Sequence, residues 1–206
     1  TPAAGISLFR FSKGHGGLVC SACHGSTHAE YPSLHRDDNL YSWGKQGHRG
    51  KLADCTVCHP SMPSNSVGGP HGIHPIGSQT WVKNHADIAR NIGITECRDC
   101  HGTDLRGTPL SRAQADRALS TKFGPFTMKR GMEVSCYYCH NGPTSSNASS
   151  HVGPTVASVP LTVPFNTPTS ITLTASGTNP QLRVIEQPIH GTVGIAGTVA
   201  TYFPDT

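Results

Sequence analysis

All eight cysteines of this 206-residue chain belong to four copies of one pattern, Cys-x-x-Cys-His, at residues 20–24, 55–59, 97–101 and 136–140. Two thiols three positions apart on a short turn can each form a thioether with one vinyl group of a haem, and the histidine that follows then lies under the iron. The pattern therefore predicts four covalently bound haems of the c type. The predicted attachment residues are Cys20, Cys23, Cys55, Cys58, Cys97, Cys100, Cys136 and Cys139, and the predicted proximal iron ligands are His24, His59, His101 and His140.

Three other uses of paired cysteines explain the pattern less well. Disulfides in a secreted chain would leave the histidine at the same offset in all four copies unexplained. Structural zinc takes two Cys-x-x-Cys pairs per ion and does not need the adjoining histidine. A thioredoxin-like redox motif would occur once, inside a βαβ unit, and the sequence shows no such unit. Haem attachment accounts for every copy.

The side chain on the second face of each iron is predicted from the remaining histidines. Thirteen histidines are present, so nine are not used as proximal ligands, whereas only Met62, Met128 and Met132 compete with them. A chain rich in histidine and poor in methionine favours two imidazoles per iron, which lowers the reduction potential relative to a histidine–methionine pair. Six-coordinate iron leaves no open position for a substrate. The predicted work is electron transfer, and no catalytic residue is expected.

Five histidines are the candidates for these distal positions: His15, His28, His48, His74 and His85. His15 and His48 have glycine neighbours just ahead of a Cys-x-x-Cys-His unit, where the backbone can approach a macrocycle closely. His28 follows a proximal histidine by four positions. His74 shares a loop with His71, which stays open as its alternative. Five candidates exceed four positions, so at least one is wrong or serves another subunit.

The fifth candidate, His85, lies in a segment with helical periodicity. Trp81, His85, Ile88 and Ile92 fall on one stripe, which predicts a helix over residues 81–92. A second, shorter helix is predicted over residues 112–119, because Ser111 and the glutamine three positions later fit a capping box.

Composition indicates that the haems must provide much of the core of residues 1–143. Only 35% of the chain is hydrophobic, while it holds 23 glycines and 16 prolines, which is poor material for long regular elements. Apolar macrocycles can supply the missing buried surface. We therefore expect a mostly irregular chain with a few short helices, wrapped around four haems.

The composition changes after the last haem motif. The stretch NGPTSSNASSHVGPT at residues 141–155 has the serine, asparagine, glycine and proline content of a linker, and residues 144–155 are predicted to form one. Residues 156–206 contain no cysteine and alternate in hydrophobicity at 170–175 and partly at 181–185, which predicts a small antiparallel β module of about five strands. This segment resembles part of the immunoglobulin-like repeats of bacterial surface proteins. It stops short of a full sandwich, so we expect its edges to be covered by another subunit or by the haem domain.

Charge and hydropathy exclude two classes of partner. The formal net charge is +4, but two propionates on each of four haems would offset it, so the basic balance does not indicate a nucleic acid. No run of about 18 apolar residues exists, so no membrane span is expected. Because no signal peptide is visible at Thr1, we expect a mature secreted chain whose leader has been removed, at the cell surface or outside the cell, with the periplasm as the alternative.

Four segments carry a resemblance to a known family: CSACHGSTHAEY at 20–31, GGPHGIHPIGSQTWVKNH at 68–85, CRDCHGTDLRGTPLS at 97–111 and CYYCHNGP at 136–143. With them the chain resembles the secreted multihaem c-type cytochromes of metal-respiring bacteria, in particular tetrahaem cytochromes that polymerise into extracellular filaments. The resemblance implies bis-histidine haems stacked alternately in parallel and T-shaped pairs along a head-to-tail homopolymer. It also implies one distal histidine donated by the adjacent protomer, for which His15 is our candidate.

The function expected from these features is conduction of electrons to redox partner proteins and extracellular acceptors. A monomeric shuttle with the same iron ligands is the alternative. A multihaem reductase with one five-coordinate haem is a third possibility, against which the surplus of histidines argues.

Overall fold

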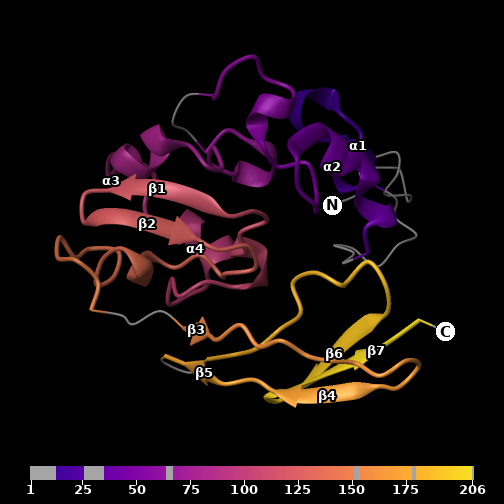
Figure 1. Ribbon diagram of the computed structural model, residues 1–206. Coiled ribbons are helices and arrows are strands. Elements are labelled where there is room, and N and C mark those ends of the chain that lie inside the picture. Colours follow the sequence, from indigo (N-terminus) through magenta and orange to yellow (C-terminus); the bar gives the residue numbers. More distant parts are fainter. Residues whose placement is uncertain (1–12, 26–34, 64–66, 151–153, 178–179, 206) are drawn as a thin grey trace.

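A computed structural model describes residues 13–25, 35–63, 67–150, 154–177 and 180–205. His28 lies outside these residues. The helices and one β hairpin form the part of the molecule built from residues up to about 150, and the strands of the C-terminal quarter lie together beside it (Figure 1). Among the described residues no helix has the length and apolar character needed to cross a membrane.

Short helical elements dominate the first part. The α-helices are α1 (Ser21–His24), α2 (Leu40–Gln46), α3 (Gln79–Ile92) and α4 (Thr95–His101). Single 3-10 turns are found at His15–Gly17, Asp37–Asn39, Cys55–Val57, Pro70–Gly72, Pro109–Ser111 and Cys136–Tyr138.

The helix predicted over residues 81–92 is confirmed as the C-terminal part of α3. The helix begins after Ser78, whose side-chain oxygen accepts a hydrogen bond from the backbone N–H of Trp81 at 3.1 Å. It ends at Gly93, whose φ of 82° disfavours any residue with a Cβ.

The helix predicted over residues 112–119 is wrong. Thr108 caps the preceding 3-10 turn, and the backbone then pairs with a distant segment: Ala113 N–H donates to the Met132 carbonyl at 2.9 Å. Strand β1 (Arg117–Thr121) follows and pairs antiparallel with β2 (Gly124–Met128). Long-range pairing with residues 124–134 therefore overrides the local helical signal.

The C-terminal strands form two small antiparallel sheets. β3 (Thr155–Val156) pairs with β5 (Ala175–Ser176), and β7 (Val199–Phe203) lies between β4 (Thr169–Thr172) and β6 (Thr192–Ala196). The strand expected at residues 170–175 is confirmed in part, because β4 covers residues 170–172. The strand expected at residues 181–185 is wrong, because these residues form no strand. One edge of the larger sheet is capped by a side chain, because the amide of Gln187 hydrogen-bonds both backbone groups of Val193.

Residues 183–186 attach the C-terminal strands to the first part of the molecule. The Glu186 carboxylate accepts from Arg49 at 2.7 Å and from Arg130 at 2.6 Å, an arrangement called here the Glu186 clasp. Ile185 packs against Gly131 so closely that a Cβ there would lie 2.5 Å from its side chain. A segment with these contacts is held in place by side chains rather than by a strand ladder, which explains why the predicted strand does not form.

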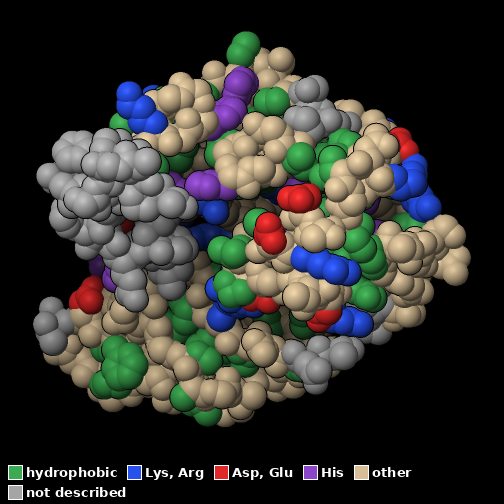
Figure 2. Space-filling view, turned by 180° about the vertical axis from the view of Figure 1, so that it is seen from behind, with side chains coloured by type: hydrophobic (Ala, Val, Ile, Leu, Met, Phe, Trp, Pro, Cys, Tyr) green, Lys and Arg blue, Asp and Glu red, His purple; other side chains and the backbone are tan. Residues whose placement is uncertain are grey.

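The polypeptide has little hydrophobic core of its own. Leu105 is the only buried hydrophobic side chain among the described residues. The chain exposes 13330 Å², whereas a folded protein of its mass exposes about 9,000 Å². Hydrophobic side chains are accordingly scattered over the surface, and histidine side chains reach it between them (Figure 2). The described residues therefore bury little apolar surface among themselves.

Candidate functional site: four histidine pairs

Each Cys-x-x-Cys-His motif folds into one helical turn. The motifs lie on α1, on the turn Cys55–Val57, on α4 and on the turn Cys136–Tyr138. In the second motif the backbone N–H of His59 donates to the Cys55 carbonyl at 2.9 Å, and the first and fourth motifs repeat this bond. The same local geometry thus places the histidine of each motif one turn beyond its first cysteine.

The eight cysteines form no disulfide. Burial raises the thiol pKa of Cys23, Cys97, Cys136 and Cys139. A redox-active Cys-x-x-Cys pair instead needs a lowered thiol pKa, because the thiolate is the nucleophile. The raised values argue against thioredoxin-like chemistry at these motifs.

Among the described residues, every motif histidine faces a histidine from outside the motifs. The distance between the two ring centroids falls in a narrow range although the partners come from different elements. The pairs are His59 with His15 at 6.0 Å, His24 with His71 at 6.2 Å, His101 with His74 at 6.3 Å, and His140 with His85 at 6.3 Å.

This spacing fits a metal ion between the two rings. A metal–imidazole bond is about 2 Å long and the ligating nitrogen lies about 1 Å from the ring centre, so two imidazoles on opposite faces of one iron have centroids about 6 Å apart. Of the described residues, no three histidine, cysteine or acidic side chains cluster into a conventional metal site. A metal ion that a bound organic group already ligates would need only two further side chains from the protein.

Hydrogen bonds to the backbone set the ring nitrogen that remains for a metal. Nδ1–H donates to a carbonyl in His85 (Val82, 2.9 Å) and His101 (Val134, 2.9 Å), and His140 makes the same kind of bond to Gly142. A proton held on Nδ1 leaves the lone pair on Nε2, as in metal-bound histidines. In the pair of His85 and His140, both rings carry this bond.

Burial favours the neutral form of two of these imidazoles, His74 and His24. Loss of solvent lowers the pKa of His74 to about 4, and the nearby His101 and His85 rings lower it further, against a weak bond to the Pro75 carbonyl. Burial likewise lowers the pKa of His24. Only a neutral imidazole can bind a metal, so both side chains are in the binding form at pH 7.

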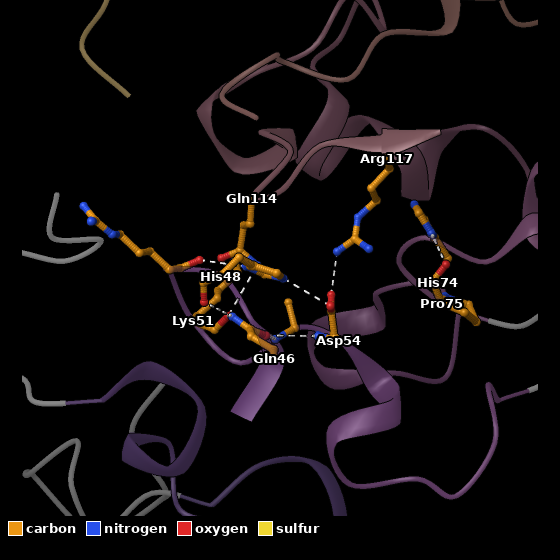
Figure 3. Close-up of polar contacts among 10 residues, drawn as sticks. Gln46, His48, Lys51, Asp54, His74, Pro75, Gln114 and Arg117 are labelled. Carbon is orange, nitrogen blue, oxygen red and sulfur yellow. Dashed lines mark hydrogen bonds and ion pairs between the residues drawn. The ribbon is translucent and has the colours of Figure 1, made fainter. Parts of the chain in front are cut away.

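His48 lies apart from the four pairs. Its Nδ1 is 2.9 Å from the Arg49 carbonyl, and its Nε2 is 3.1 Å from a carboxylate oxygen of Asp54. The other oxygen of Asp54 accepts from Arg117 on β1 at 2.5 Å (Figure 3). Hydrogen bonding to Asp54 raises the pKa of His48 despite its partial burial. The structure therefore places this predicted ligand in a polar network that holds the segment ahead of the second motif.

His71, left open in the sequence, is brought to a motif histidine. It sits at φ 56° in the turn Pro70–Gly72, an unusual conformation for a residue other than glycine. His74 follows three residues later and faces a different motif. The sequence offers these two histidines as alternatives, but the loop presents both to motif histidines.

Aromatic side chains surround the third and fourth motifs. Trp81 stacks on His74, Phe123 lies near His140 at 6.4 Å, and Phe126 stacks on Tyr138. The β1–β2 hairpin and Cys139 line a cavity of about 150 Å³. A planar group attached at the fourth motif would meet the rings of Phe123 and Phe126 beside this cavity.

Comparison with known proteins finds no matching family model, no matching curated protein and no matching solved structure.

Proposed function

We propose that this chain is a tetrahaem c-type cytochrome whose task is electron transfer. The four histidine pairs carry the proposal, because each motif that would attach a haem has one second imidazole at the spacing required for the opposite face of the iron. The small amount of apolar surface that the polypeptide buries by itself supports it as well.

In this proposal the cysteines hold each haem, the motif histidine is the proximal ligand, and the paired histidine is the distal one. His71 then serves the first motif, His15 the second, His74 the third and His85 the fourth. His48 has no place among the ligands and instead braces Asp54. The haem supplies an iron that cycles between two oxidation states.

The chain's own residues control that chemistry in three ways. Two imidazoles exclude substrates from the iron and favour a low reduction potential. Backbone carbonyls bonded to Nδ1, such as those of Val82 and Val134, make the imidazole a stronger donor and lower the potential further. The aromatic side chains beside His74 and beside the fourth motif would cover part of the bound haems.

A homopolymer that extends this function is also proposed, as an extracellular filament that conducts electrons to external acceptors. Apolar side chains on the C-terminal module support it, since Phe165 is 91% exposed and Ile189 is 75% exposed. His15 is exposed, so a neighbouring protomer's copy could take its position opposite His59. Electron microscopy and size-exclusion chromatography of native material test this part. Monomers alone at high concentration would leave an electron shuttle as the function.

The experiment that tests the cytochrome proposal is a count of covalent haem. The chain is produced in a host that attaches c-type haem, and its intact mass is measured after denaturation. We expect four haems per chain. The Cys97→Ala/Cys100→Ala double variant should carry three, which controls for haem bound without a thioether. A chain with no attached haem, or one with disulfides among these cysteines, contradicts the proposal.

A further inference from the structure

Trp81 contacts the proposed distal ligands of two different motifs. Its ring lies parallel to His74, with centroids 4.3 Å apart and an interplanar angle of 5°. The same ring is 6.3 Å from His85 at an angle of 36°. The bond from its backbone N–H to buried Ser78 fixes Trp81 in the first turn of α3. A rigid aromatic plane therefore lies against the His74 imidazole.

His74 has a weaker hydrogen bond to hold its ring than His85 and His101 have, so the stack with Trp81 matters more to it. Its Nδ1 is 3.5 Å from the Pro75 carbonyl, which is a weak hydrogen bond, whereas His85 and His101 make theirs at 2.9 Å. A weak hydrogen bond leaves rotation of the ring about its bond to Cβ poorly restrained. The indole supplies the restraint, because the imidazole cannot turn without losing the stack.

The angle between the two rings of a pair divides the four pairs into two groups. It is 15° for His74 with His101 and 26° for His85 with His140, so these rings are close to parallel. It is 54° for His15 with His59 and 74° for His24 with His71. Axial imidazole planes split the iron d orbitals differently when parallel and when crossed. Low-spin ferric haems of the two kinds give different electron paramagnetic resonance spectra, rhombic for parallel planes and strongly anisotropic for crossed ones.

We propose that Trp81 is a positioning residue that holds the His74 imidazole parallel to His101 and so sets the electronic character of the haem at the third motif. This inference rests on the proposed function. Trp81 would contact the ligand His74 and not the iron itself. Orientation of a ligand is then a further way in which the chain tunes a haem.

The test compares frozen-solution resonance spectra of oxidised holoprotein carrying Trp81→Leu or Trp81→Phe with those of the unaltered protein. The unaltered protein should show rhombic signal from two haems and anisotropic signal from the other two. Leucine cannot stack, so Trp81→Leu should lose half of the integrated rhombic signal, a two-fold fall. Phenylalanine can stack and should retain most of it. Trp43→Leu is the matched control, since Trp43 is 51% exposed and lies near Arg49.

Each outcome decides the inference. A rhombic signal unchanged in Trp81→Leu with four haems bound would overturn it. The inference would also be overturned if all four haems of the unaltered protein gave the anisotropic signal. This second measurement does not require the Trp81→Leu variant to fold or accumulate. Equal losses in Trp81→Leu and Trp81→Phe would also overturn it, because stacking would then not be the cause. If the unaltered protein gives no low-spin ferric signal at all, the proposed function itself fails.

Discussion

Removal of the Glu186 carboxylate should release the C-terminal module from the rest of the molecule. In Glu186→Ala the Arg49 and Arg130 guanidinium groups lose their shared acceptor. The Arg49 side chain is 7% exposed and that of Glu186 is 44% exposed, so the cost lies between the less than about 1 kcal/mol of an exposed pair and the roughly 3–5 kcal/mol of a buried one. We expect about 2 kcal/mol, which raises the population of the released state about 30-fold.

Tryptic cleavage after Arg183 measures this population. The Arg183 guanidinium is bonded to Glu133 in the attached state, so trypsin acts when the segment opens. Each cleavage rate is divided by the rate for a synthetic peptide with the same sequence around Arg183, carrying either Glu or Ala at position 186. This division removes any direct effect of residue 186 on the protease. Glu186→Ala should be cleaved about 30-fold faster, while Asp87→Asn, which breaks an ion pair with 70% and 72% exposed partners, should leave the rate unchanged. A ratio close to one for Glu186→Ala would refute the clasp.

Two other predictions concern the histidines and their neighbours. His71→Ala should convert one haem in four to a five-coordinate, high-spin form that binds cyanide in an optical titration, whereas His48→Ala should leave all four low-spin; the reverse result would exchange their roles. Burial would raise the pKa of Asp54, but its bonds to His48 and Arg117 lower it. Its stabilising effect is therefore complete above the ordinary carboxyl pKa and is lost as pH falls through the lower folded value. The difference in unfolding free energy between the unaltered protein and Asp54→Asn, from denaturant titrations, should shrink on acidification below about pH 4. A difference that grows on acidification would contradict this.

Local sequence determines the features that were predicted successfully. The helix over residues 81–92 depends on its own periodicity and on a serine cap, and no distant residue is needed to recognise either. Each Cys-x-x-Cys-His motif similarly forms one turn within five residues.

Contacts between distant residues determine the rest. Pairing with residues 124–134 turns the segment at 112–119 away from a helix. His71 and His74 are only three positions apart, yet they face His24 and His101, which lie on opposite sides of them in the sequence. Spacing in the sequence selects candidate histidines by the residues next to them. It cannot show which distant histidine ring each candidate faces. The pairing of His48 with Asp54 could not be predicted either. Nothing near His48 in the sequence shows whether its partner is a carboxylate or an iron.

The central claim is that four irons are each held between two imidazoles, and near-infrared magnetic circular dichroism of the oxidised holoprotein tests it most directly. This measurement reports the pair of axial ligands through the energy of a charge-transfer band. We predict a band for bis-imidazole haem with the intensity of four haems per chain. A band from histidine–methionine ligation, a high-spin component in the unaltered protein, or no haem band at all would contradict the account.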